Sequence, residues 1–287
     1  MIRLLLCIFI GLALVSCQKE SDLGQNPLPP GSNDSIYLDR IEIVENGDTL
    51  TAISFVYDNL NRVVTMAESP TFGDFQVYDY YYHGNDTVPY LKRVVERGLP
   101  SIDTLWTYLF YDAAGKITKD SSIRLILDPG SPGPDISTYV RKFSYAPSKI
   151  YSVTDVFPGS LSSPYQQTDT SMLDARGNIL QTNSWTMRSG VPELHSTSIF
   201  TYDDKLHPFT FMSNYRAHRD IPFGETLFLE YLPVNNILTQ NETLDGFPWM
   251  EIVNTYQYNA NGLPSKMLVN DLAIGETWVL LFKYKPA

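Results

Sequence analysis

A tyrosine-centred pattern recurs nine times along this chain, at gaps of about 25 to 34 residues. The clearest copies start at Tyr57, Tyr111 and Tyr258, and a fourth has Leu173 at the anchor position. The looser copies have Tyr82, Tyr145, Tyr202, Tyr231 and Tyr284 at that position. A repeat of this length indicates an array of similar supersecondary units, so it constrains the fold before any local feature does.

Each anchor residue ends a segment in which large apolar side chains occupy alternate positions. In eight of the nine copies the residue two places before the anchor is leucine or aromatic, as Phe55 before Tyr57 and Leu109 before Tyr111. A helix would place two such side chains about 200° apart around its axis, whereas a strand places them on one face. The pattern therefore predicts strands with one buried face, and we expect the anchor rings to lie in the core.

A tight turn follows each of the four clear copies. The turn begins with a side chain that accepts hydrogen bonds from nearby backbone N–H groups: Asp58, Asp112, Asp174 and Asn259. Three residues later stands a residue type that tolerates positive φ: Asn61, Gly115, Gly177 and Gly262. Such turns join antiparallel strands. The sequence therefore predicts an all-β fold over residues 36–287, a strongly twisted antiparallel meander of about sixteen strands that can curl towards an open barrel.

The segments from Tyr57 to Val63 and from Tyr111 to Ile117 resemble the YD repeats of Rhs-type and related bacterial wall and surface proteins. The consensus of that family runs tyrosine, aspartate, two variable residues, glycine, a basic residue and an aliphatic residue; Asn61 replaces the glycine in the first segment. The resemblance covers about residues 40 to 287. It implies a β-hairpin repeat lipoprotein of the bacterial cell envelope.

The residue between each anchor and the apolar residue two places before it points to the opposite face of the sheet, so its polarity indicates whether that face is buried. From first copy to last these residues are Val56, Tyr81, Phe110, Ser144, Met172, Thr201, Glu230, Gln257 and Lys283. The early ones are apolar and the late ones polar, so we expect only the N-terminal third of the sheet to be covered on both faces. The polar positions also argue against a barrel embedded in the outer membrane, because the lipid face of such a barrel is apolar throughout.

Residues 1–16 have the form of a lipoprotein signal peptide, with a positive start and an apolar run over residues 4–15. The run ends in Leu14-Val15-Ser16-Cys17, which resembles the lipobox of bacterial lipoproteins. That resemblance implies cleavage before Cys17 and its acylation, which would anchor the protein to a membrane. An ordinary secretory signal is the alternative. Residues 17–35 predict a flexible tether, and we expect an outer-membrane lipoprotein that is surface-exposed or faces the periplasm.

Charge and cysteine content narrow the partners and the compartment. The net charge is −11, and an acidic chain without a basic stripe lacks the electrostatic footprint of a nucleic-acid-binding protein. Of the two cysteines, Cys7 lies in the predicted signal peptide. The mature chain therefore has no internal disulfide and depends on its core for stability.

A search for catalytic and metal-binding patterns returns no candidate. His83, His195, His207 and His218 lack metal-ligand spacing, and neither a nucleophile elbow nor a phosphate-binding glycine loop occurs. Glu193 and His195 alternate on a strand-like stretch, where an exposed pair is the simpler interpretation. We therefore predict no cofactor, no metal and no enzymatic activity.

Two aromatic loops are the candidates for ligand binding. The first concentrates aromatic and cationic side chains: Tyr215, Arg216, His218, Arg219 and Phe223. The second contains Phe247 and Trp249. Exposed Tyr, Trp and Arg dominate binding hot spots, so the loops predict a recognition site. The alternative is that these rings fold back over the sheet.

The sequence thus predicts a lipid-anchored envelope protein with a binding or structural role, recognising a glycan or a protein at the cell surface. Two alternatives remain, an envelope scaffold without a ligand pocket and a glycan-active hydrolase. A pocket with two carboxylates about 5 to 10 Å apart would favour the hydrolase. An exposed aromatic patch would favour the binding protein, and absence of both features would favour the scaffold.

Overall fold

The computed structural model describes residues 36–45, 47–70, 75–97, 102–128, 133–159, 163–188, 190–211 and 233–286. These residues belong to one compact unit, Asp34–Ala287. They form sixteen strands and one 3₁₀-helix, η1 (Pro208–Phe211). The strands are β1 Ile36–Glu45, β2 Asp48–Tyr57, β3 Val63–Pro70, β4 Phe75–Tyr81, β5 Leu91–Arg97, β6 Ile102–Tyr111, β7 Ile117–Leu127, β8 Asp135–Ala146, β9 Lys149–Phe157, β10 Tyr165–Leu173, β11 Ile179–Arg188, β12 Val191–Leu206, β13 Asn235–Leu244, β14 Phe247–Tyr258, β15 Pro264–Asp271 and β16 Glu276–Pro286.

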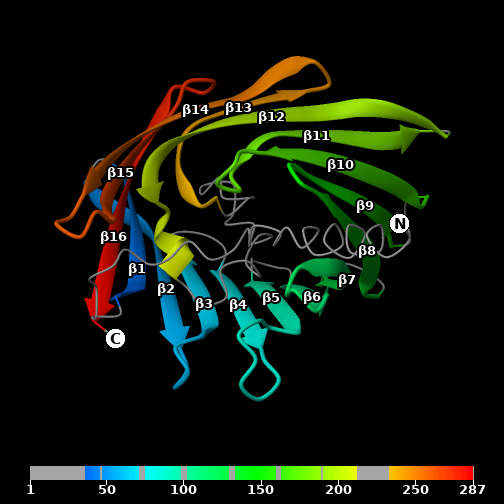
Figure 1. The fold of residues 1–287 in the computed structure, drawn as a ribbon. Helices are drawn as coiled ribbons and strands as arrows, with labels where there is room; N and C mark the ends of the chain where they lie inside the picture. The colour runs from blue at the N-terminus through cyan, green and yellow to red at the C-terminus, as the bar shows by residue number, and fades with distance from the viewer. Residues whose placement is uncertain are drawn as a thin grey trace, which may run out of the picture. The chain divides into compact units, whose positions relative to one another are not determined.

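Each strand pairs with the strands before and after it, and the last strand pairs with the first, so the sheet closes into a barrel (Figure 1). The closing pair, β1 and β16, is antiparallel and runs from Ile36 opposite Pro286 to Val44 opposite Val279. The all-β antiparallel fold and the strand number are confirmed, whereas the barrel is closed and not open. Closure pairs the two edges that a sheet of this width would otherwise expose.

The hairpin connections divide between the two ends of the barrel. We name the end that carries the β2–β3, β6–β7, β10–β11 and β14–β15 links the turn end; β1 starts there and β16 ends there. We name the opposite end the rim. It carries the eight links from β1–β2 to β15–β16.

The turns expected from the sequence are present at the turn end. Asp58 Oδ1 accepts hydrogen bonds from the N–H groups of Leu60 and Arg62, both at 2.9 Å, and Asn61 has a φ of 60°. The same arrangement recurs at Asp112 with Gly115 (φ 74°), Asp174 with Gly177 (φ 90°) and Asn259 with Gly262 (φ 75°). Positive φ at the fourth residue lets the chain turn directly into the next strand.

At the turn end, tyrosine side chains form hydrogen bonds between neighbouring strands that are connected along the chain only at the opposite end. Each donates its hydroxyl hydrogen to a backbone carbonyl near the start of the preceding strand. The seven bonds are Tyr57 to Leu38 (2.7 Å), Tyr82 to Val63 (2.7 Å), Tyr111 to Pro89 (2.8 Å), Tyr145 to Ile117 (2.8 Å), Tyr202 to Ile179 (2.6 Å), Tyr256 to Ile237 (3.0 Å) and Tyr284 to Pro264 (2.8 Å). Between β9 and β10, where the anchor is Leu173, the Leu173 N–H donates to the Ser148 carbonyl at 2.8 Å instead.

Apolar side chains fill the barrel along β1–β4 and β14–β16. This main cluster includes Ile41, Phe55 and Trp278, together with Phe209 from η1. The expected core position of the anchors holds for rings such as that of Tyr57, which packs partly buried against the main cluster, but it is wrong for Tyr258, which is 36% exposed. Tyr231 lies outside the described residues. Two smaller clusters lie near the turn end, around Leu109 with Ile117 and around Ile179 with Phe200 and Ile237. Elsewhere the side chains on the inner face of the barrel are mainly polar, and the candidate site lies in this polar part.

The outer wall differs from two expectations. Val56 and Phe110 are 52% and 47% exposed, so the predicted covering of both faces in the N-terminal third is wrong. A barrel needs a core only on its inner face, because its outer face meets the surroundings.

Phe247 and Trp249 were expected in a loop but are the first and third residues of β14, directly after a two-residue turn. No helix in the described residues has the length and apolarity needed to cross a membrane.

Candidate functional site

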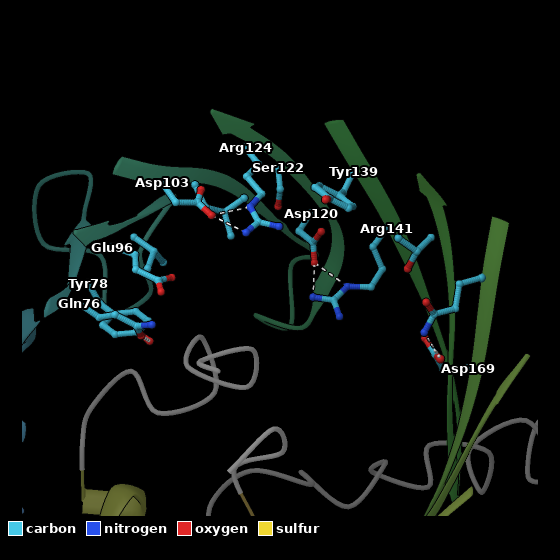
Figure 2. Close-up of a pocket in the computed structure, with 14 residues that line it drawn as sticks. Gln76, Tyr78, Glu96, Asp103, Asp120, Ser122, Arg124, Tyr139, Arg141 and Asp169 are labelled. Carbon is cyan, nitrogen blue, oxygen red and sulfur yellow. Dashed lines mark hydrogen bonds and ion pairs between the residues drawn. The ribbon is translucent and has the colours of Figure 1, made fainter. Parts of the chain in front are cut away.

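A cavity of about 500 Å³ lies inside the barrel against the inner faces of β4 to β10. Its volume is within the range of small-molecule binding sites. The lining residues are Gln76, Tyr78, Val94, Glu96, Asp103, Leu105, Asp120, Ser122, Arg124, Tyr139, Arg141, Thr154, Gln167 and Asp169. Since side chains alternate between the two faces of a strand, residues at alternate positions share the inner face, as Figure 2 shows for the labelled side chains.

Two carboxylates in the cavity form ion pairs with arginines on the next strand (Figure 2). Arg124 Nε donates to Asp103 Oδ2 at 2.7 Å, and Arg124 Nη2 contacts the same oxygen. The hydrogen bond that Arg124 donates to Asp103 raises the pKa of Arg124. Arg141 binds Asp120 Oδ2 through Nε at 2.9 Å and Nη2 at 2.7 Å. Asp120 and Arg141 face each other directly in the β7–β8 register, so the strand pairing itself aligns them.

The third carboxylate, Asp169 on β10, is held by neutral donors. Ser152 Oγ on β9 donates to Asp169 Oδ2 at 2.7 Å, and Ser184 Oγ on β11 donates to Oδ1 at 2.6 Å. Gln167 Nε2 donates to Oδ1 at 3.1 Å. Three neighbouring strands therefore fix the orientation of this carboxylate.

Asp103 has one oxygen that lacks a hydrogen-bond partner among the described residues. Its Oδ2 accepts both bonds from Arg124, while its Oδ1 is buried and has no hydrogen-bond partner among the described residues. A buried acceptor without a partner costs about 1–3 kcal/mol.

Negative charge concentrates where the cavity meets β3, β4 and β5. Gln76 lies between Glu68 and Glu96 in the strand register. Burial, and then the charge of Glu96, raises the pKa of Glu68. Burial, and then these two carboxylates, raises the pKa of Tyr78, so its phenol stays protonated and donates to Gln76 Oε1 at 2.6 Å. With four carboxylates and two arginines, the cavity lining is acidic and favours neutral or cationic ligands over anionic ones.

The sequence did not identify these luminal residues, although a signal was present. Counting back from the anchor Tyr111 in steps of two passes Leu109, Thr107 and Leu105 and reaches Asp103. A polar residue that continues the buried face of a strand therefore marks a polar lumen. Each anchor and the residue two places before it lie at the apolar end of their strand, so these pairs do not show that the inner face becomes polar further along the strand.

The candidate residues from the sequence lie elsewhere. Phe247 and Trp249 are 74% and 62% exposed at the rim, outside the cavity lining. Cys17, Tyr215, Arg216, His218, Arg219 and Phe223 lie outside the described residues, as do the predicted signal peptide and tether. Within the described ranges, no three His, Cys, Asp or Glu side chains are grouped to hold a metal ion.

Comparison with solved structures relates this barrel to two porin-like proteins. The one from Bacteroides vulgatus ATCC 8482 has a TM-score of 0.53 at 9% identity, over 88% of this chain and 99% of that chain. The one from Bacteroides uniformis ATCC 8492 has a TM-score of 0.36 at 11% identity, over 86% of this chain and 98% of that chain. The fold is porin-like. No protein-family model matches the chain, and no curated protein matches it either.

The resemblance to YD repeats is therefore wrong. The similar structure is a porin-like protein, and no family model supports a relation to Rhs-type proteins. The recurring tyrosines and turns have a geometric cause in this barrel. Each even-numbered strand is connected to the preceding strand at the rim, so no turn joins this pair at the turn end. In seven of these pairs a tyrosine hydroxyl forms a hydrogen bond that joins the two strands at the turn end.

Proposed function

We propose that this chain is a lipid-anchored, non-catalytic protein of the outer membrane whose barrel binds a neutral, hydroxyl-rich ligand, such as a segment of a glycan, in its lumen. The cavity with its Asp103–Arg124 and Asp120–Arg141 pairs carries the proposal. A sugar hydroxyl is both donor and acceptor, and an aspartate beside an arginine offers one acceptor and several donors at the same place. The rings of Tyr78 and Tyr139 add apolar surface to the lining.

The outer wall supports anchoring to the membrane and argues against spanning it. Glu42, Arg93 and Glu251 point outward near the middle of β1, β5 and β14, since the neighbouring positions on those strands face inward. Further outward polar residues are Arg40, Asp79, Lys119, Lys142, Asn183, Asn270 and Lys283. An arginine or lysine on the lipid face near the bilayer midplane costs about 2–4 kcal/mol. Charges distributed around the whole circumference favour a barrel in water, attached through acylated Cys17.

Three of the four carboxylates that line the cavity favour binding over hydrolysis. A glycosidase needs one carboxyl group that donates a proton and a second that acts as base or nucleophile. Here Asp103 and Asp120 bind guanidinium groups, and Asp169 accepts three hydrogen bonds. All three are arranged as acceptors. The cavity also favours a binding protein over a scaffold without a ligand pocket, and the porin-like neighbours support a non-catalytic role.

The test compares two Asp→Asn variants in a glycan array followed by calorimetry. Asp103→Asn removes a luminal ion pair with Arg124, whereas Asp79→Asn removes a matched ion pair with Arg93 on the outer wall. Hydrogen bonds to charged groups contribute about 1.5–3 kcal/mol, so we expect Asp103→Asn to weaken binding of a neutral glycan at least about tenfold. Asp79→Asn should bind like the wild type.

Three results would contradict the proposal. These are equal affinity of the wild type and both variants, preference for anionic glycans, and release of a hydrolysed product. Thermal melting of each variant provides the control for folding.

A further inference from the structure

Exposed apolar side chains gather at the rim of the barrel. Of the 21 large hydrophobic residues exposed in the described part of the chain, twelve lie in links or among the four residues at a strand end on the rim, against seven at the turn end. The rim group comes from seven of the eight links there. Examples are Phe75, Phe157, Val191, Phe247, Trp249 and Ile274, which are 39% to 74% exposed.

The rim also carries negative charge. Exposed acidic residues stand on five of the rim links: Asp48, Asp128, Glu193, Asp245 and Glu276. Of these, Asp245 lies with its Oδ1 3.2 Å from His195 Nδ1. Arg97 is an exposed cation at the end of β5. At the start of β12, Glu193 lies between the apolar residues Val191 and Leu194, so acidic and apolar groups occur together on this link. At the turn end, the turns that start at Asp58, Asp112, Asp174 and Asn259 are mainly polar, and residues 212–232 of the β12–β13 link lie outside the described residues.

Such a surface needs a partner, since large exposed apolar patches mark interaction sites. Two possible binding partners match the charge of the rim poorly. An anionic bilayer surface would repel the acidic side chains, and a second copy of this chain would bring two acidic rims together. A protein surface with basic side chains around an apolar patch fits both features, because charge complementarity adds to apolar burial.

We propose that the rim is a docking surface for a partner protein that presents lysine and arginine side chains around an apolar patch. Because β1 starts at the turn end, the predicted tether is expected to join the barrel there, at the end opposite the rim. The proposal does not depend on ligand binding in the lumen. If ligand binding in the lumen is disproved, docking at the rim can still be tested, and the reverse also holds.

The experiment is photo-crosslinking in cells that express the full-length chain. A benzophenone amino acid replaces Phe247 at the rim or, as the matched control, Leu60 at the turn end, which is 44% exposed. We expect the Phe247 probe to give one protein adduct at a yield at least about tenfold above that of the Leu60 probe. Mass spectrometry of the adduct should identify a partner peptide that contains both basic and apolar residues.

Two pairs of variants separate the apolar and the electrostatic contributions, with the probe placed at Phe75. Phe247→Ser with Trp249→Ser should lower the yield at least about tenfold, because exposed aromatic residues are frequent hot spots. Val56→Ser with Leu60→Ser is the control at the turn end. Asp48→Lys with Glu276→Lys should also lower the yield, and Asp86→Lys with Asp204→Lys is its control, since both residues are exposed near the turn end. All eight positions are on the surface, and thermal melting checks that each variant folds.

Several outcomes would overturn the proposal. Equal yields from both probe positions, or no adduct from Phe247, would mean that the rim has no partner. An adduct with a phospholipid, with a second copy of the chain or with the chain's own N-terminal segment would assign the rim to that occupant instead. A partner peptide without basic residues, or a yield unchanged by Asp48→Lys with Glu276→Lys, would remove the electrostatic part of the argument and with it the stated partner.

Discussion

Tyrosine at the end of an even-numbered strand does two things at once in this barrel. Its ring lies partly buried inside, and its hydroxyl binds the carbonyl of the neighbouring strand, as Tyr202 does with Ile179 at 2.6 Å. Burial raises the pKa of Tyr202, so the hydroxyl remains a donor at neutral pH. Phenylalanine would supply the ring but not the bond, which explains why tyrosine recurs where other apolar positions vary between Phe and Leu.

Tyr202→Phe should lower the free energy of unfolding by about 1 kcal/mol, and by up to about 3 kcal/mol if the Ile179 carbonyl is left without a partner. The measurement is urea denaturation followed by fluorescence. Tyr108→Phe is the matched control, because Tyr108 is 43% exposed on the outer wall. Equal effects of the two substitutions would show that the Tyr202 hydroxyl contributes nothing specific.

Among the elements, η1 is the one that departs from the meander. It follows β12 and places Phe209 in the main cluster, where its ring meets Phe55 edge-on at a centroid distance of 5.9 Å. His207, just before η1, is buried, and its Nδ1 lies 3.3 Å from the Phe209 nitrogen, which donates to it. Burial lowers the pKa of His207 to about 3. The folded protein therefore holds this imidazole neutral.

This burial predicts a loss of stability in acid. The unfolded chain binds a proton at His207 below pH of about 6.5, whereas the folded chain does not until pH approaches 3, so protonation favours unfolding between these values. The stability that neutral His207 confers is present above pH 6.5 and is lost as the pH falls, by about 2 kcal/mol at pH 5.

The measurement is the free energy of unfolding from pH 7 to pH 4 for the wild type, His207→Phe and His83→Phe. Other groups also titrate in this range, so the quantity of interest is the difference between wild type and variant. We expect His207→Phe to flatten the curve relative to the wild type and to His83→Phe, which replaces an exposed histidine. Parallel curves for the wild type and His207→Phe would contradict the assignment.

At the scale of the whole molecule, the barrel separates three environments. The apolar core occupies one side, the acidic cavity lies against β4 to β10, and the outer wall carries charged residues on many strands. A closed sheet makes this division possible because each strand has only one inward face. The proposed attachment to a membrane depends on acylation of Cys17, which lies outside the described residues.

Cys17→Ser tests this attachment in the full-length chain. If the barrel is anchored and does not span, the variant should move from the membrane fraction to the soluble fraction without detergent. Cys7→Ser is the matched control and should remain with the membrane, because Cys7 lies in the predicted signal peptide. Retention of Cys17→Ser in washed membranes would contradict anchoring and favour a spanning barrel.

The turns and strands were predictable because their causes lie within a few residues. Asp58 binds the N–H groups of residues two and four places on, and Asn61 takes the positive φ that closes the turn. The candidate site was not predictable in the same way. Asp120 and Arg141 are 21 residues apart in the chain, and only the pairing of β7 with β8 brings them together.

The sequence alone determined the all-β class, the number of strands and the chemistry of the turns, since alternation and turn formation are local. The tertiary structure decided that Ile36 pairs with Pro286, that the lumen near β4 to β10 is acidic, and that exposed apolar groups gather at the rim. These features depend on which strand ends meet around a closed circle, and no local pattern contains that information. The family resemblance failed for the same reason, because a short motif that joins neighbouring strands does not specify how the whole sheet closes.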